Sequence, residues 1–378
     1  MKLSARAGSA VLLLVSLALC ALAGEAIARF QATRGVSHRG GETKHHFNVF
    51  RPDGALGFAL RPNWSGVHEK FDFSVHVHTD AAGFRAAPDA PASHVRSAPY
   101  RILVVGDSFA FGWGVEDGET FAAVLEHRLA RERPVAVINA GVPGYSTDQY
   151  WIFLQTRGFA LAPDLVLLTE CGNDVYELAS NRMELDADRL PVRVSSLTRT
   201  ITARGKMSFD NNALIPIPTF RFPGDGWLID HSHFYNLLRF QTMRLWIAAV
   251  EGRSLAQRAR GELPAPDAAI GALAPAAIER GLAGSEAFRL AYHDYLIAAI
   301  EREAGGRGIA LRTLLIEDAP EPLRAACRPE RCIDQAALFT RAAKEMYFPI
   351  DRHWTAAGHR AVGEALAAWL APVLGASR

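Results

Sequence analysis

The middle and the end of the chain alternate short, fully apolar runs with longer stretches in which apolar residues recur at helical spacing. Strands are predicted at the apolar runs, near residues 101–106, 135–139, 164–170 and 309–315. Because these runs are apolar on both faces, the strands are expected to be buried on both sides, as in a parallel sheet. Helices are predicted from about Thr120, from about Thr147, over 285–303 and over 355–374. This order predicts right-handed crossovers and an α/β three-layer sandwich with a parallel central sheet.

A different pattern precedes this core, over residues 31–99, which are polar and rich in Gly, Pro and His. Apolar and polar residues alternate over 71–78, which predicts half-exposed antiparallel strands. We therefore expect a small β-rich preamble before the core. His76 and His78 fall on the same face of one predicted strand, but no Asp, Glu or Cys lies at ligand spacing beside them or beside the other histidine clusters. A solvated face is favoured over a metal site.

The regular rhythm is lost between about residues 180 and 284, inside a domain expected to extend over 100–376. This stretch holds an apolar helix candidate over 237–250 and a part rich in Ala, Pro and Gly over 262–284. We interpret it as an insertion, on which a substrate pocket or lid could be built. With 378 residues, the chain is then one large domain with additions.

The first 30 residues have the composition of an export signal. Two basic residues precede an unbroken apolar stretch over 10–23, which ends in the small-residue pattern 21–23. The alternative is an uncleaved membrane anchor, because apolar residues after Glu25 lengthen the span. Both interpretations place the body of the protein outside the cytoplasm, either anchored to a membrane or released into the periplasm or the medium.

Charge and cysteine content narrow the partners and the compartment. The formal net charge is +1 and the basic residues are dispersed, so nucleic acid is not an expected partner. Cys327 and Cys332 are close enough in sequence to form a disulfide in an oxidising compartment. Without a second pair they do not have the spacing of a zinc site. Cys171 follows an apolar strand and is interpreted as a small buried hydrophobe, not as a reactive thiol.

Polar residues follow three successive predicted strands. Ser108 follows the first strand in a Gly-Asp-Ser turn, Gly144 follows the second, and Asn173 follows the third. Parallel strands end at one edge of their sheet, where ligands bind in open α/β folds, so these residues are expected to converge. The turn by itself has another explanation, because Asp and Ser after a strand commonly cap the next helix.

A second polar cluster lies just before the last predicted helix. Asp351 and His353 point the same way in an extended segment, so the carboxylate is placed to orient the imidazole, whose other nitrogen would face a strand-end serine. A helix cap beside an exposed histidine explains the same residues. His359, six residues further on, is the rival base. We favour His353 because a loop position lets it lean over the sheet edge.

Together these residues resemble the SGNH (GDSL-type) serine hydrolases, whose fold is a flavodoxin-like three-layer sandwich. The four blocks of that pattern occur in the family's order at 106–109, 139–144, 172–174 and 351–353. Many members space the last pair as Asp-x-x-His. The Asp-x-His-Trp found here resembles membrane-associated and polysaccharide-acetylating relatives.

The resemblance implies that Ser108 is the nucleophile, His353 the base and Asp351 its orienting partner. It also implies an oxyanion hole made by the Ser108 amide, the Gly144 amide and the Asn173 side chain, each donor worth about 3 kcal/mol. A serine needs an adjacent base, and a glycine lets the backbone approach closely. No Gly-x-Ser-x-Gly elbow occurs, which disfavours the other common hydrolase architecture.

The expected function is therefore a serine esterase that removes small acyl groups, acetyl above all, from envelope or extracellular carbohydrate. No cofactor or metal is expected. The expected partners are a small acyl ester or an acylated carbohydrate, and a membrane through the N-terminal segment. Transfer of the acyl group to a polysaccharide is an alternative, because hydrolysis and transfer share one acyl-enzyme. A glycan-binding protein without activity is another, but a binding module has no need of a base beside a nucleophile.

Overall fold

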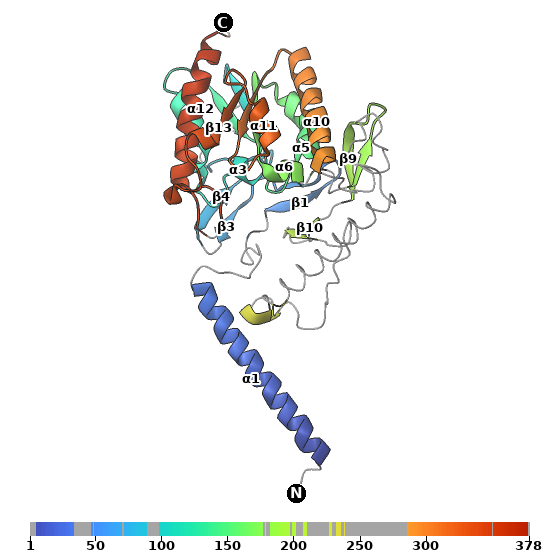
Figure 1. Ribbon diagram of the computed structural model, residues 1–378. Helices are drawn as coiled ribbons and strands as arrows, with labels where there is room; N and C mark the ends of the chain where they lie inside the picture. The colour runs from blue at the N-terminus through green and yellow to red at the C-terminus, as the bar shows by residue number, and fades with distance from the viewer. Residues whose placement is uncertain are drawn as a thin grey trace. The chain divides into compact units, whose positions relative to one another are not determined.

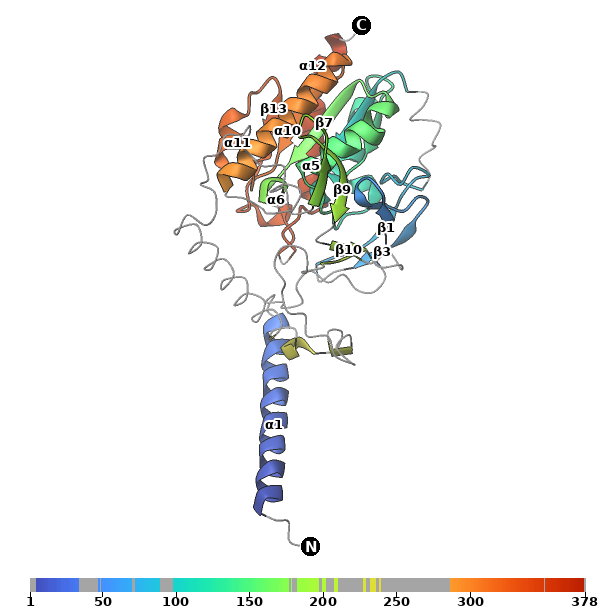
Figure 2. The ribbon, with the colours of Figure 1, turned by 90° about the vertical axis from the view of Figure 1, so that its right-hand side faces the viewer.

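A computed structural model (Figures 1 and 2) describes residues 5–33, 47, 49–69, 72–88, 98–176, 178, 182–196, 199–201, 207–209, 227–228, 232–235, 238, 286–349 and 351–376. The chain divides into two compact units. One contains residues 1–42 and 215–263, and the other contains 43–214 and 264–378.

The larger unit is built on a five-stranded parallel sheet with the strand order β13-β12-β7-β5-β6. Its strands are β5 (Arg101–Val105), β6 (Ala136–Asn139), β7 (Leu165–Glu170), β12 (Ala310–Leu315) and β13 (Cys332–Asp334). The four predicted strands are confirmed, each within one residue at either end. The strand β13 was not predicted, because three residues at the edge of a sheet leave too short a pattern to identify.

Helices cover both faces of this sheet, which confirms the three-layer prediction. They are α4 (Phe121–Leu129), α5 (Thr147–Phe153), α10 (Glu286–Gly306) and α12 (Ala356–Ala376). Ile102 and Val104 share a buried cluster with α4 and α12, whereas Leu103 and Val105 share one with α5 and α10. Successive residues of a strand point to opposite faces, so α12 and α10 lie on opposite sides of the sheet (Figure 1).

Short elements connect these layers. They are the helices α3 (Ser108–Phe111), α6 (Gly172–Tyr176) and α11 (Glu321–Ala326), 3-10 turns at Asp117–Glu119, Phe159–Leu161, Gln335–Ala337 and Lys344–Met346, and a π turn at Leu154–Gly158. The insertion begins with two antiparallel hairpins. Their strands are β8 (Arg182–Leu185), β9 (Pro191–Ser196), β10 (Arg199–Ile201) and β11 (Met207–Phe209). The expected helix over 237–250, apart from residue 238, and the part rich in Ala, Pro and Gly over 262–284 lie outside the described residues.

The described part of the preamble is β-rich, as predicted. It forms two antiparallel hairpins, β1 (Phe50–Asp53) with β2 (Gly57–Leu60) and β3 (Ser65–Glu69) with β4 (Ser74–His78). Both hairpins contribute buried side chains to the cluster that contains α5. They lie at the end of the unit where α3 and α6 follow β5 and β7 (Figure 1). The preamble is therefore packed beside the carboxyl edge of the sheet.

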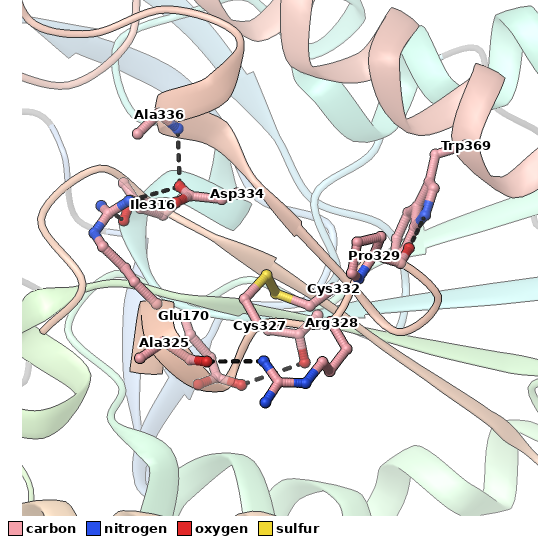
Figure 3. Close-up of a disulfide and its surroundings, with 12 residues drawn as sticks. Glu170, Ile316, Ala325, Cys327, Arg328, Pro329, Cys332, Asp334, Ala336 and Trp369 are labelled. Atoms are coloured by element: carbon pink, nitrogen blue, oxygen red, sulfur yellow. Dashed lines mark hydrogen bonds and ion pairs between the residues drawn. A yellow bond between two sulfur atoms is a disulfide. The ribbon is translucent and has the colours of Figure 1, made fainter. Parts of the chain in front are cut away.

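A disulfide joins Cys327 to Cys332, as the sequence analysis anticipated (Figure 3). It closes the short loop between α11 and the edge strand β13. The indole nitrogen of Trp369, on α12, donates a hydrogen bond of 2.8 Å to the Pro329 carbonyl in the same loop. The edge strand is thus held both covalently and against the last helix.

The smaller unit contains the N-terminal helix α1 (Ala5–Thr33). Its segment Val11–Phe30 has a mean hydropathy of 2.4, and by length and composition it is able to cross a membrane. The Glu25 carboxylate accepts hydrogen bonds from the Ser232 hydroxyl at 2.8 Å and from the amides of His233 at 3.1 Å and Phe234 at 2.9 Å. Part of the insertion is therefore bound to α1.

Stability at alkaline pH is expected to depend on His293, which links α10 to β7. Its Nε2 lies 3.0 Å from the Glu170 carboxylate, and both side chains are buried. Burial by itself disfavours the charged imidazole, but Asp294 and Glu170 raise the pKa of His293 to about 9. A raised pKa stabilises the fold fully below pH 6.5, and that contribution, about 3 kcal/mol, is lost as the pH rises through 9.

We therefore expect the free energy of unfolding, measured with urea, to fall over that pH range in the wild type and to vary much less in His293→Gln. An equal decrease in both proteins would show that His293 does not carry the effect.

Candidate functional site

The site begins where β5 ends. The strand is followed by the turn 106–107, and Ser108 is the first residue of α3. Asp107 caps this helix by accepting a hydrogen bond of 2.9 Å from the Phe109 amide. The capping role therefore belongs to Asp107. In the strand order, β5 and β7 are neighbours, and the chain leaves β5 toward β6 but leaves β7 toward β12. The two connections therefore diverge at the carboxyl edge of the sheet, which is where ligands bind in open α/β folds.

His353 reaches Ser108 from the other end of the chain. Its Nε2 lies 2.8 Å from the Ser108 hydroxyl, and its Nδ1 lies 2.5 Å from a carboxylate oxygen of Asp351. The prediction of an extended segment is wrong, because Arg352 has a left-handed φ of 73° and the chain turns at this residue. This turn is what brings the two side chains together at the shorter Asp-x-His spacing.

Aromatic rings surround the imidazole. Phe109 and Trp113 lie 4.8 Å and 5.8 Å from the His353 ring, centroid to centroid, and the Trp113 indole donates a hydrogen bond of 3.3 Å to Asp351. The His353 side chain is 22% exposed and that of Asp351 only 5%. The base is thus open to a substrate while its carboxylate partner is shielded. Trp113 was not predicted as a site residue, because a tryptophan shortly after the Gly-Asp-Ser turn is equally well explained as a residue of the hydrophobic core.

The rival base His359 is not at the site. It is completely buried, and its Nδ1 accepts a hydrogen bond of 3.3 Å from the Phe121 amide. Burial, followed by the charges of Arg85 and His353, lowers the pKa of His359 to about 3. It is therefore neutral at physiological pH and serves as a link between α12 and α4.

Asn173, at the start of α6, lies beside the nucleophile. Its Nδ2 donates a hydrogen bond of 3.1 Å to Asp107 Oδ2, the same oxygen that lies 3.1 Å from the Ser108 hydroxyl oxygen. Asp107 thereby ties the ends of β5 and β7 together. The amide group has a second hydrogen besides the one donated to Asp107.

Cys171 is buried, as expected, but its surroundings are polar. Its sulfur lies 2.6 Å from the Asn173 side-chain oxygen and 3.3 Å from Asp107. Burial and the charges of Asp107 and Asp174 raise the pKa of Cys171 well above its usual value, so it remains a neutral donor. Burial and Asp107 also raise the pKa of Asp174, which accepts a bond of 2.6 Å from the Tyr150 hydroxyl.

Gly144 lies in the loop that follows β6. Its φ of 83° is in the left-handed region, which favours glycine. The loop is fastened to the nucleophile turn by a hydrogen bond of 3.0 Å from the Val142 amide to the Gly106 carbonyl. At Gly141 the loop touches α3 so closely that an added Cβ would lie 2.3 Å from the Phe111 amide nitrogen.

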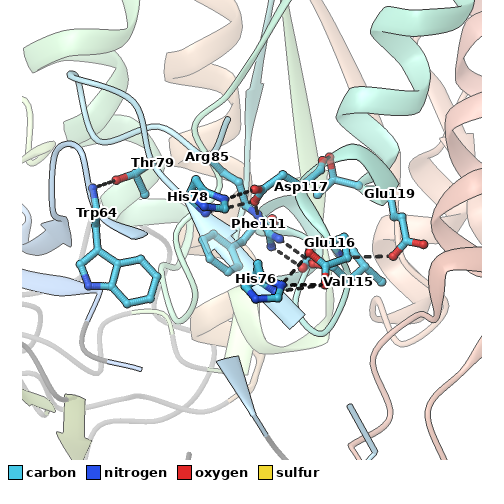
Figure 4. Close-up of polar contacts among 12 residues, drawn as sticks. Trp64, His76, His78, Thr79, Arg85, Phe111, Val115, Glu116, Asp117 and Glu119 are labelled. Atoms are coloured by element: carbon cyan, nitrogen blue, oxygen red, sulfur yellow. Dashed lines mark hydrogen bonds and ion pairs between the residues drawn. The ribbon is translucent and has the colours of Figure 1, made fainter. Parts of the chain in front are cut away.

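The preamble holds the other end of α3 (Figure 4). Arg85 is buried and donates hydrogen bonds to the carbonyls of Phe111, Gly112 and Val115, at 3.1, 2.6 and 2.5 Å. It also pairs with Asp117 at 2.9 Å. Nothing in the sequence distinguishes this arginine from the surface ones.

The two strand histidines differ in their surroundings. His78 bonds to Asp117 at 2.6 Å with its side chain 23% exposed, so the predicted solvated face is wrong for that residue. His76 has a side chain that is 68% exposed, in agreement with the prediction. Within the described part of the chain, no group of His, Cys, Asp or Glu that could hold a metal ion is found.

Comparison with known proteins gives a family match over most of the larger unit. The model of the GDSL-like Lipase/Acylhydrolase family matches residues 104–361. The chain is similar to the structure of TesA, with 14% identity, 72% of this chain and 99% of that chain covered, and a TM-score of 0.36. The structure of a two-domain esterase active on acetylated mannans shares 12% sequence identity, with 76% of this chain and 52% of that chain covered and a TM-score of 0.35. The structure of a lipase/acylhydrolase from Enterococcus faecalis shares 14% sequence identity, with 72% of this chain and 96% of that chain covered and a TM-score of 0.29. No curated protein matches.

The contact between the Gly144 loop and α3 is expected to control activity. Gly141→Ala should push the loop away from the nucleophile turn and lower kcat for p-nitrophenyl acetate by about 10- to 100-fold. Gly118→Ala is the matched control, because a Cβ at Gly118 meets nothing within 4 Å. Equal kcat values in the two variants would contradict this role of the contact.

Proposed function

Because this chain belongs to the GDSL-like lipase/acylhydrolase family, and is therefore an ester-bond hydrolase, we propose that it cleaves small acyl esters through an acyl-enzyme on Ser108. The single observation that carries the proposal is the chain of contacts from Asp351 through His353 to Ser108, at 2.5 Å and 2.8 Å. A serine hydroxyl becomes a competent nucleophile only beside a base that accepts its proton.

In the first half-reaction, His353 Nε2 takes the proton of Ser108 while Oγ attacks the carbonyl carbon of the ester. The imidazolium that forms is stabilised by Asp351, which holds Nδ1. The negative oxygen of the tetrahedral intermediate is bound by the amides of Ser108 and Gly144 and by the Asn173 side chain. His353 then gives its proton to the leaving alcohol oxygen, and the acyl group stays on Ser108.

In the second half-reaction, His353 takes a proton from water while the water oxygen attacks the acyl-enzyme. His353 then returns that proton to Ser108 Oγ as the bond to the acyl group breaks and the carboxylic acid is released. A sugar hydroxyl in place of water would make the same enzyme an acyltransferase. We propose hydrolysis as the main reaction, because the His353 side chain is partly exposed and water has direct access to it.

We propose acetylated carbohydrate of the envelope or the extracellular space as the substrate class. This rests on the apolar N-terminal helix, which is suited to export or anchoring, and on the intramolecular disulfide, which is typical of an oxidising compartment. A protein that only bound glycans would have no need of a base held against a serine.

We expect Ser108→Ala and His353→Ala each to lower acetate release from p-nitrophenyl acetate and from acetylated polysaccharide by at least about 1000-fold. The double variant should be little worse than either, because the two residues act as one unit. His359→Ala serves as the comparison and should keep its activity per folded molecule. A fully active, folded Ser108→Ala protein would exclude the mechanism, and loss of activity only in His359→Ala would mean that His359 is the base.

We further propose that α1 is retained as a membrane anchor. Cleavage after the small-residue pattern 21–23 would remove most of the helix to which Ser232, His233 and Phe234 are bound through Glu25. A carboxylate near the end of an apolar span is costly unless it is paired, and these donors, with Arg29 at 2.7 Å, pair it.

The exported protein, carrying a C-terminal tag, is therefore expected to stay in the membrane pellet after a carbonate wash and to have the mass of the full chain. A soluble product that begins near Gly24 would show instead that the segment is a cleaved signal.

A further inference from the structure

One contact of the site comes from outside the region that the family model matches. Asp72 lies between β3 and β4, and its carboxylate accepts a hydrogen bond of 2.6 Å from the backbone amide of Asp351. The two residues are 279 positions apart in the chain. A short bond from an amide to a carboxylate belongs to the stronger class of hydrogen bonds in proteins. The preamble thus reaches the residue that orients the base.

Packing beside this bond leaves little room for movement. The ring of Phe73 lies 5.1 Å from that of Phe348, at the start of the turn that carries Asp351 and His353. Gly114 faces the same two rings, and an added Cβ there would lie 2.7 Å from Phe348 and 2.9 Å from Phe73. The β3–β4 hairpin is therefore pressed against the turn that carries the base.

The turn needs such support because its own backbone does not favour it. Arg352 has a φ of 73°, a conformation that costs a residue with a Cβ about 1–2 kcal/mol. Two hydrogen bonds close the turn internally, from the Phe348 amide to the His353 carbonyl at 2.8 Å and from the Arg352 amide to the Phe348 carbonyl at 3.1 Å. A strained turn persists only where surrounding contacts over-determine it, and Asp72 supplies one of these contacts.

We propose that Asp72 is a positioning residue for the base, which holds the Asp351 backbone so that its carboxylate stays on His353 Nδ1. This inference rests on the proposed function, in which His353 activates Ser108. Asp72 acts only through Asp351, so its contribution is realised in kcat and not in substrate binding.

The first test is the kinetics of Asp72 variants of the full chain with p-nitrophenyl acetate. Asp72→Ala should lower kcat by about 10- to 100-fold with KM little changed. Asp72→Asn keeps a carbonyl oxygen at the same position and should retain most of the activity. Asp72→Glu keeps the charge but moves the acceptor by one methylene, and should lose kcat. Equal activity of the Asn and Glu variants would overturn the proposal, and this comparison holds even if the Ala variant does not fold.

A double-variant cycle separates positioning from general stabilisation. In the Asp351→Ala background, adding Asp72→Ala should cause no further loss of kcat, because the residue through which Asp72 acts is already gone. Losses that multiply would mean that Asp72 acts by another route, and the inference would fail.

Asp80 provides the matched control in the same segment. Its carboxylate accepts hydrogen bonds of 2.8 Å from the Ala82 and Phe84 amides, which is the same type of contact away from the turn that carries the base. Asp80→Ala should lower the melting temperature while kcat stays near the wild-type value; an equal kcat loss in both Ala variants would overturn the inference.

The variants of Ser108 and His353 distinguish a failure of the proposed function from a failure of the proposed role of Asp72. If those variants are inactive while Asp72→Ala is as active as the wild type, only the role of Asp72 is wrong. If Ser108→Ala stays active, the proposed function fails, and the role of Asp72 fails with it.

Discussion

The hydrogen bond between Ser108 and His353 is the contact on which the rest of the molecule depends. It joins residues 245 positions apart, one at the end of a central strand and the other in a turn before the last helix. The strand order explains why the meeting is possible. Because the chain leaves β5 toward β6 and leaves the neighbouring β7 toward β12, the two connections diverge at the carboxyl edge, beside Ser108. Helices packed on both faces of the sheet bury the strands that lead to this edge.

Buried charge organises the floor of the site. Asp107 is almost fully buried, but its carboxylate accepts hydrogen bonds from the Phe109 amide and the Asn173 side chain and lies 3.1 Å from the Ser108 hydroxyl oxygen. A buried carboxylate is tolerated only with such partners, and each one that is removed makes the buried group less well compensated. The same group therefore caps α3 and fixes the ends of two strands. Cys171 completes the network as a neutral thiol instead of as a nucleophile.

The preamble is part of the site's framework and not only an addition to the core. Arg85 accommodates the last carbonyls of α3, and Asp72 bonds to the turn that carries the base. The segment after β4 thus supports the helix that carries the nucleophile, and the β3–β4 hairpin supports the turn that carries its partner. This arrangement accounts for an Asp-x-His pair in which the intervening Arg352 is left-handed. Contacts from the preamble hold this turn in place, because a left-handed residue is kept in a folded chain only where surrounding contacts support it.

The sequence by itself was enough to predict the central strands, the covering helices and the nearness of Ser108 to His353 and to Asn173. These signals are local, since fully apolar runs, helical spacing and short motifs at strand ends all act over a few neighbouring residues. The choice between His353 and His359, the left-handed turn at Arg352, and the roles of Asp72, Trp113 and Arg85 were decided only by the tertiary structure. Each of these depends on contacts between distant segments and on burial. Contacts and burial of this kind leave no pattern along the chain, so a buried arginine or aspartate looks like one at the surface.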